Sequence, residues 1–254
     1  MVIKMKEENI FDVEEIKKIL LSSEHAVFFG GAGVSTDSGI PDFRGKGGLY
    51  DTDDDSEGES REYYLSRECL VHEPEKFFDF FRSNMIFDSF EPNGAHTALA
   101  ELERRGIIKA VITQNIDGLH QRAGSERVIE LHGASDRSYC TRCGKVYTNE
   151  IISESNGIPH CKVCRFLVRP DVTLYGEALD GFNYADAQDE ISNADVLIVG
   201  GSSLVVHPAA SLIDAFEGEH LIIVNYSPTP YDSLAEYVIR DSLSEVLTFL
   251  AEEE

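Results

Sequence analysis

Residues 26–36 read AVFFGGAGVST, and this stretch decides the fold. Its first four residues are apolar and predict a buried strand, the glycines predict a tight turn, and the small polar residues after them are expected to open a helix. Strand, glycine turn and helix form the entry unit of a nucleotide-binding α/β sheet. The G-x-G-x-x-T of residues 31–36 lacks the third glycine of the dinucleotide fingerprint, so a purely structural turn is the alternative interpretation.

The same alternation of strand and helix recurs along the chain and predicts an α/β fold, a Rossmann-like parallel sheet covered on both faces. Asp12 and Glu15 resemble a capping box for the first helix, and Gly106 is expected to end the second. An ordinary NAD dehydrogenase is a poor match, because residues 113–115 read TQN where that class has an acidic residue. Further strands are expected at 110–113, 194–199 and 221–224, and helices at 12–21, around 99–102 and at 208–215.

The composition limits the classes of partner. The chain has 254 residues with 46 Asp and Glu against 22 Lys and Arg, a formal net charge of −24. This balance argues against direct binding of nucleic acid and against adsorption to an anionic membrane. The apolar runs are too short to span a bilayer, and residues 1–9 contain no apolar segment typical of a secretory signal. We therefore expect a soluble cytoplasmic protein.

Four of the five cysteines have the spacing of a metal site. Cys140, Cys143, Cys161 and Cys164 form C-x2-C-x17-C-x2-C, and two such knuckles close a tetrahedral zinc site. Four thiolates leave no open coordination position, so the ion is expected to be structural. Four unrelated buried cysteines are the alternative, and Cys69 is expected to be a buried or loop thiol.

Two segments interrupt the strand–helix alternation and predict an inserted small domain, a zinc ribbon with helices. Residues 51–62 contain seven acids and one Arg, and residues 140–164 contain the cysteine cluster. The predicted large domain comprises 1–45, 87–138 and 170–254, and the small domain comprises 46–86 and 139–169.

Six ordered blocks resemble the sirtuins, a family of NAD-dependent protein deacylases. The first block, residues 31–44, matches the family's first motif almost letter for letter, and the cysteine cluster stands at the expected place after the third. The blocks read GAGVSTDSGIPDFR (31–44), TQNIDGLH (113–120), LHG (131–133), RPDVTLYGE (169–177), GSSLVVHP (201–208) and VN (224–225). The resemblance extends from about residue 26 to 247.

The resemblance implies NAD as co-substrate, one structural zinc ion, and acetyl-lysine proteins or peptides as substrates, with a monomeric enzyme expected. It implies His132, Asn115 and Asp117 as catalytic residues. Implied NAD contacts are Gly31, Ala32, Gly33, Ser35, Thr36, Asp42, Phe43, Arg44, Gln114, Asn115, Ile116, Asp117, His132, Gly201, Ser202, Ser203, Asn225, Tyr226 and Leu243. Implied peptide contacts are Val172, Thr173, Tyr175, Gly176, Glu177 and Val206.

In the implied reaction the acyl oxygen of the lysine attacks C1′ of the nicotinamide ribose, and nicotinamide leaves. Asp117 would hold the nicotinamide carboxamide, and Phe43 would shield the reactive face. The later attack of the 2′-hydroxyl needs a base near neutral pH, which is the range of histidine, and His132 is the candidate. The peptide is expected to bind by strand addition between residues 172–177 and 201–206. His96, His120 and His207 are interpreted as packing or loop-shaping residues.

Alternatives to lysine deacetylation are removal of other neutral acyl groups, mono-ADP-ribosyl transfer, and a catalytically silent NAD or ADP-ribose sensor. The presence of His132, Asn115 and Asp117 favours the enzyme over the sensor. Relatives that remove succinyl or malonyl groups carry a Tyr and an Arg where this chain has Phe81 and Asn84, so we expect a preference for neutral acyl groups. The acidic residues of 51–62 are candidates for a rim beside the cofactor site that attracts lysine-rich peptides. The alternative is that they contribute only to the solubility of the protein.

Overall fold

The computed structural model describes residues 6–42 and 60–253. Its main sheet has six strands in the order β3-β2-β1-β7-β8-β9, and every neighbouring pair is parallel. The strands are β1 (Ala26–Gly30), β2 (Ile108–Thr113), β3 (Val128–Glu130), β7 (Val196–Gly200), β8 (His220–Val224) and β9 (Tyr237–Ile239). The predicted α/β class and the four strands expected from apolar runs are confirmed.

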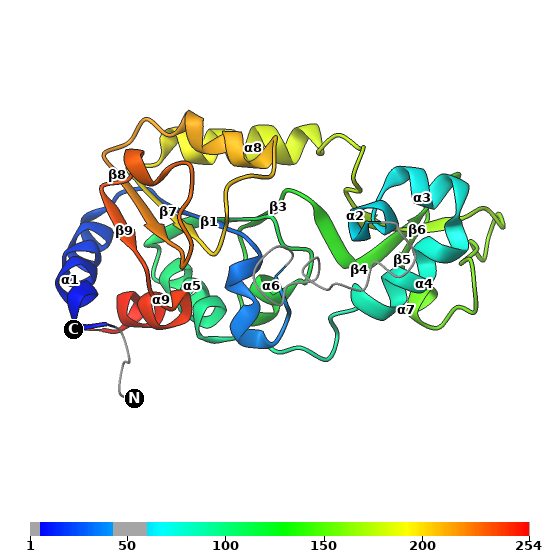
Figure 1. Ribbon diagram of the computed structural model, residues 1–254, viewed down its shortest axis with the longest axis horizontal. Helices are drawn as coiled ribbons and strands as arrows, with labels where there is room; N and C mark the ends of the chain where they lie inside the picture. Colours follow the sequence, from blue (N-terminus) through cyan, green and yellow to red (C-terminus); the bar gives the residue numbers. More distant parts are fainter. Residues whose placement is uncertain (1–5, 43–59, 254) are drawn as a thin grey trace.

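Helical segments cover both faces of this sheet (Figure 1). Alternate residues of β1 point to opposite faces: Phe28 packs in one hydrophobic core, and Val27 and Phe29 pack in the other. No helix in the described part of the chain is long and apolar enough to cross a membrane. The first core is closed by α1 (Glu7–Ser22), α5 (Gly94–Arg104) and α9 (Leu243–Ala251), and the second by α8 (Gly181–Asn193) and the 3-10 helix η3 (Ala209–Ala215).

A smaller group of elements lies at the opposite end of the molecule from α1 (Figure 1). Its antiparallel sheet has the order β5-β4-β6, and Phe77, Phe78 and Phe81 form the centre of an aromatic core beside it. Strands β4 and β6 run across the predicted domain boundaries near residues 138 and 169. The elements are α2 (Arg61–Tyr64), α3 (Arg67–His72), α4 (Pro74–Asn84), β4 (Gly133–Cys140), β5 (Val146–Thr148), α7 (Glu150–Ser153) and β6 (Val168–Val172).

Three expectations about helices are wrong in detail. Helix α1 begins at Glu7, so Asp12 lies inside it and caps nothing; Asp241 instead accepts hydrogen bonds from the Lys6 amide and the Asn9 side chain and fixes the helix start. The glycine turn leads into two 3-10 turns, η1 (Ala32–Val34) and η2 (Thr36–Ser38), rather than an α-helix. The helix expected at 208–215 is also of the 3-10 type.

The turns after β1 and β7 are in direct backbone contact. The Gly33 amide donates to the Gly201 carbonyl at 2.8 Å. A Cβ on Gly33 would lie 2.7 Å from Gly201 Cα, and one on Gly201 would lie 2.5 Å from the Val34 nitrogen. Because neither position has room for a side chain, glycine at both is a steric requirement of this contact.

We predict that Gly201→Ala destabilises the protein far more than Gly106→Ala. Both glycines have positive φ, +60° and +73°, but a Cβ on Gly106 meets nothing within 4 Å. The left-handed backbone alone costs about 1 kcal/mol, and the clash at Gly201 adds about 2 kcal/mol or more. Urea unfolding of both variants measures the difference, and equal destabilisation would contradict the steric requirement.

Candidate active site and metal centre

The predicted polar residues meet at the carboxyl edge of the main sheet. Gln114 follows β2 and donates from its side chain to Ser202 Oγ at 2.9 Å, after β7. The Gln114 amide donates to the carbonyl of Gly30, the last residue of β1. Asn225 follows β8 at the same edge. Strands β1, β2 and β7 thus bring residues far apart in the sequence into one site, as expected at the carboxyl ends of parallel strands.

A buried hydrogen-bonded cluster lies beneath this edge. Ser35 Oγ donates to Asp117 Oδ2 at 2.6 Å and accepts from Asn115 Nδ2 at 3.1 Å. The Leu119 amide donates to the other carboxylate oxygen of Asp117 at 2.9 Å. Burial raises the pKa of Asp117, against the lowering effect of these hydrogen bonds. The cluster therefore fixes the orientation of the Asp117 and Asn115 side chains before any ligand binds.

A pocket opens beside this cluster. It combines the polar side chains of Ser35, Asn115 and Asp117 with an apolar wall that includes Ile40 and Phe87. A few convergent polar groups on an apolar lining are typical of a small-molecule site. The remaining lining residues are Ala32, Pro41, Asn84, Met85 and Ile116.

His132 lies between the two sheets, in the link from β3 to β4. Its Nδ1 lies 2.8 Å from the Gln114 carbonyl oxygen, so Nδ1 carries the hydrogen and Nε2 keeps the lone pair. Burial lowers the pKa of His132 below its ordinary value of 6.5, and the Gln114 carbonyl offsets only part of that effect. The imidazole is therefore neutral at pH 7 and can accept a proton at Nε2.

Gly133 permits this placement of His132. Its φ is +75°, and a Cβ at this position would lie 2.0 Å from the Asp171 carbonyl oxygen of β6. The Thr173 amide donates to the His132 carbonyl at 2.8 Å. The backbone around His132 is thus held between the end of β3 and the segment after β6.

The segment expected to bind peptide is held by an internal ion pair. Arg169 donates two hydrogen bonds to the Glu177 carboxylate, at 2.6 and 2.8 Å, and the Leu174 amide donates to the same carboxylate at 3.0 Å. Burial opposes ionisation of Glu177, but these hydrogen bonds outweigh it and lower the pKa. The Tyr175 amide and carbonyl pair with Leu65 and Arg67. Glu177 therefore holds the shape of this loop, whereas Tyr175 is 37% exposed.

The glycine turn uses most of its amides internally. Those of Gly31, Gly33, Val34 and Ser35 donate to carbonyls of the protein. Among the described residues this leaves the amides of Ala32 and Thr36 in this turn for a phosphate, and no α-helix N-terminus follows.

The other predicted NAD and peptide contacts are distributed as follows. Phe43 and Arg44 lie outside the described residues, as does most of the acidic segment 51–62. Ser202 and Leu243 are buried, Asp42, Val206 and Gly201 are partly exposed, and Thr36, Ser203, Tyr226 and Gly176 are exposed; Val172 is buried and Thr173 partly exposed.

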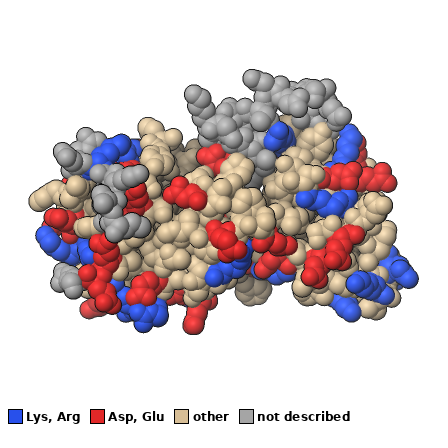
Figure 2. Space-filling view, turned by 90° about the horizontal axis from the view of Figure 1, so that it is seen from below, with Lys and Arg blue, Asp and Glu red and all other residues tan. Residues whose placement is uncertain are grey.

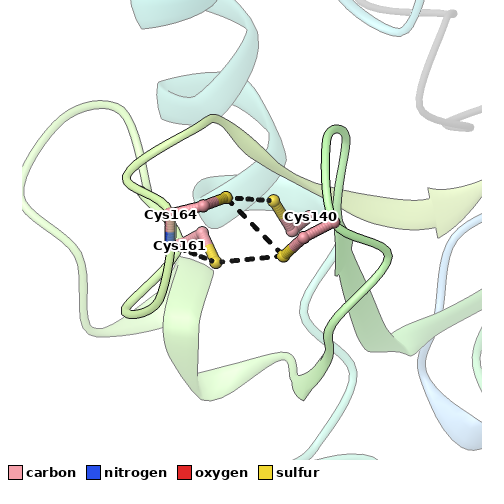
Figure 3. A group of neighbouring side chains, drawn as sticks. Cys140, Cys161 and Cys164 are labelled. Atoms are coloured by element: carbon pink, nitrogen blue, oxygen red, sulfur yellow. Dashed lines mark hydrogen bonds between the residues drawn. The ribbon is translucent and has the colours of Figure 1, made fainter.

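The four predicted metal ligands lie together beside the small antiparallel sheet, and their sulfur atoms are within 4.8 Å of one another (Figure 3). The Cys140–Cys164, Cys143–Cys164 and Cys143–Cys161 sulfur distances are 3.4, 3.6 and 3.7 Å. A tetrahedral ion with Zn–S bonds of about 2.3 Å requires sulfur separations of about 3.8 Å. The four thiols therefore fit one zinc ion, and no ligand position is left for substrate.

Each knuckle turns in the same way. The amide of the residue after each C-x2-C donates at 3.0 Å to the carbonyl of the first cysteine: Gly144 to Cys140 and Arg165 to Cys161. Both Gly144 and Arg165 have positive φ, +69° and +64°. The Tyr147 hydroxyl lies 3.1 Å from Cys161 Sγ and adds a side-chain partner to that sulfur.

Sequence reasoning missed one member of the active-site cluster. His96 is fully buried, its Nε2 lies 3.5 Å from Ser35 Oγ, and its Nδ1 accepts from the Asn93 amide in a capping box. In the sequence, Asn93 and His96 indicate only the start of a helix. The contact of His96 with Ser35 joins residues 61 positions apart, so no local pattern reveals it. His120 is a packing residue, as expected, with its ring centroid 4.8 Å from that of His96.

The fold and site define a class of α/β nucleotide-binding protein with a four-cysteine metal module inserted. The Sir2 family model matches residues 31–208. The chain is 49% identical to an "NAD-dependent protein deacetylase" of Clostridium tetani, over 94% of this chain and 97% of the relative, and 50% identical to one of Clostridium acetobutylicum, over 92% and 96%.

Solved structures agree with these matches. A "Sir2-p53 peptide-NAD+" structure superposes with a TM-score of 0.81 at 40% identity, covering 97% of each chain. A structure of "Sir2 bound to acetylated peptide" superposes with a TM-score of 0.83 at 39% identity, covering 94% of this chain and 96% of the other. The chain belongs to the Sir2 family.

We predict that Cys161→Ala loses the metal and that Cys69→Ala keeps it. Both cysteines are fully buried, but only Cys161 lies in the cluster of four sulfurs. Three thiolates hold zinc far less tightly, and metal binding is coupled to folding of the surrounding segment. Elemental analysis of the purified proteins should find one zinc per chain in the wild type and in Cys69→Ala, and much less than one in Cys161→Ala. Full zinc content in Cys161→Ala would contradict the four-thiolate site.

Proposed function

We propose that the chain is an NAD-dependent protein-lysine deacetylase whose products are nicotinamide, O-acetyl-ADP-ribose and free lysine. The observation that carries this proposal is the placement of His132, whose Nδ1 lies 2.8 Å from the Gln114 carbonyl oxygen, which leaves Nε2 to accept a proton. The relatives named as deacetylases, matched over nearly the whole chain, support it. NAD supplies the leaving nicotinamide and the ribose that accepts the acetyl group.

The roles of this chain's residues follow from their contacts. The pocket of Asn115, Asp117 and Ile116 holds the nicotinamide end of NAD, and Asp117 presents a carboxylate already oriented by Ser35 and the Leu119 amide. Gln114, fixed by Ser202, borders the ribose. His132 takes the proton of the ribose 2′-hydroxyl at Nε2. By the sequence resemblance, Phe43 shields the reactive face and Arg44 contacts the phosphates of NAD.

The remaining parts of the proposal concern the peptide and the setting. The segment 172–177, held in shape by the Arg169–Glu177 ion pair, and the loop 201–206 bind the peptide backbone. We also propose that the large and small domains meet at 45/46, 86/87, 138/139 and 169/170. We further propose a monomer in the cytoplasm without direct contact with nucleic acid or membrane, a setting that the net charge of −24 supports.

Peptide-dependent nicotinamide release tests the function as a whole. With purified protein and NAD, an acetylated peptide should stimulate nicotinamide release and yield one free lysine per nicotinamide. Release that an acetylated peptide leaves unchanged would contradict the deacetylase.

We predict that His132→Ala separates two partial reactions. Deacetylation should fall by at least about 100-fold, because removal of a general base costs that much. Exchange of labelled nicotinamide into NAD, which precedes the base-dependent step, should persist at a measurable rate. His72→Ala, at an exposed position of α3, is the control and should retain both activities. Loss of exchange together with deacetylation would show that His132 acts earlier.

We predict that kcat for deacetylation stays high at neutral pH and declines only as the pH falls below 6.5. The sign follows from the base role: the neutral imidazole is active, and burial lowers the pKa of His132 from 6.5, so protonation requires more acid than for an exposed histidine. Nicotinamide exchange in the same buffers is the control and should not share this inflection. An inflection above pH 7 would contradict a desolvated His132.

We predict faster removal of acetyl than of succinyl from the same peptide, by about tenfold or more, the value of one charge-assisted hydrogen bond. Phe81 is buried in the aromatic core. Asn84 lines the pocket, and its side-chain Nδ2 donates to the Phe80 carbonyl. Neither of these two side chains is cationic, so neither can pair with a succinyl carboxylate. Asn84→Arg should narrow the ratio and Asn84→Gln should leave it unchanged, as measured by kcat/KM for both peptides. A wild-type preference for succinyl would overturn the prediction.

A further inference from the structure

The ends of the two zinc knuckles carry four cations and no acid. Arg142, Lys145, Lys162 and Arg165 lie in residues 140–148 and 159–168, which contain none of the chain's 46 acids. All four side chains are exposed. In a protein with about two acids for every base, this is the reverse of the prevailing charge. Figure 2 shows several Lys and Arg side chains at the small-domain end of the molecule, with Asp and Glu side chains on neighbouring elements.

These four cations also have no acidic neighbour among the described residues, in contrast to several other arginines of the chain. Elsewhere, Arg127 and Arg137 each lie within 4.0 Å of two or more carboxylates, and Arg169 pairs with Glu177. Within the described part of the chain, no carboxylate lies within 4.0 Å of the four knuckle cations. Their charge is therefore not compensated at the surface.

Exposed apolar side chains stand among the four cations. Val146, Val163 and Phe166 are 66%, 65% and 47% exposed. The Arg142 guanidinium lies 4.4 Å from the ring centroid of Phe166, so the two knuckles contact each other through these side chains. The sulfur contacts of Figure 3 hold the knuckles together from within. We call these seven residues, four cations and three apolar side chains, the knuckle face.

We propose that the knuckle face docks an acidic segment of a partner protein in which an apolar side chain stands between carboxylates. The carboxylates pair with the four cations, and the apolar side chain covers Val163 and Phe166. Nucleic acid is the less favoured ligand, because three of the seven residues of the knuckle face are exposed apolar side chains, which a phosphate backbone would leave uncovered. This surface is distinct from the active site and goes beyond the proposed deacetylation.

A different explanation is that the cations only balance the metal centre. Zinc with four thiolates carries a formal charge of −2, which nearby cations stabilise. The sulfurs already receive hydrogen bonds from the amides of Arg142, Val163 and Cys164 and contact the Tyr147 hydroxyl. Four cations also exceed the charge to be balanced. The two explanations differ in what the cations control, partner affinity or zinc retention.

The test uses the full-length zinc protein and a fluorescein-labelled twelve-residue peptide that repeats Glu-Glu-Leu. The first variant is Lys162→Gln with Arg165→Gln, and Arg142→Gln with Lys145→Gln repeats the test on the other knuckle. Lys18→Gln with Lys109→Gln is the matched control, because it removes the same charge at exposed positions of the large domain. Fluorescence anisotropy gives the peptide affinity, and the rate of zinc transfer to a chelator gives zinc retention.

We expect the wild type to bind the peptide, each knuckle variant to bind it at least about fivefold more weakly, and the control to change less than twofold. Zinc transfer should stay within twofold in all variants. Equal weakening in the control would assign binding to net charge and overturn the proposal. Faster zinc loss with unchanged peptide affinity would assign the cations to the metal centre, and tighter binding of a dT12 oligonucleotide than of the peptide would assign the face to nucleic acid.

Discussion

The backbone contact between Gly33 and Gly201 is the constraint on which the site depends. A parallel sheet ends all its strands at one edge, but a site forms there only if the turns leaving the strands approach closely. With no side chain at either position, the Gly33 amide reaches the Gly201 carbonyl at 2.8 Å. Gln114 from β2 then reaches Ser202 beyond β7, and Ser35 reaches Asp117. Any Cβ at these two glycines would separate the parts of this network.

The junction between the two sheets places the proposed base. His132 sits between the last residues of β3 and the first of β4, and Gly133 lets the backbone pass within van der Waals contact of β6. Partial burial lowers the pKa of the imidazole, and the Gln114 carbonyl selects its tautomer. Cys140 is the last residue of β4 and one of the four clustered thiols, so the metal module lies at the end of this strand opposite His132.

Sequence and structure agree where the signal is local. Strands β1, β2, β7 and β8 were predictable because their apolar runs are short and end in glycine or polar residues, whereas the three-residue strands β3 and β9 are only partly buried and were not. The four thiols were predictable because C-x2-C spacing defines a knuckle. The start of α1 was not predictable, since it depends on Asp241, more than 230 residues away. The contact of His96 with Ser35 was not predictable either. The same holds for the hydrogen bonds from four amides of the glycine turn to carbonyls of the protein. The ion pair of Glu177 with Arg169 was not predictable either, because it depends on how the segment folds back on itself.

The tautomer of His132 tests the central assignment most directly. In protein labelled with 15N-histidine, NMR spectra of the wild type and His132→Ala identify the His132 ring nitrogens. At pH 7.5 the structure predicts a hydrogen on Nδ1 and none on Nε2, because Nδ1 faces the Gln114 carbonyl at 2.8 Å. A hydrogen on Nε2 at that pH, in the neutral or the charged ring, would contradict the assignment of His132 as the base.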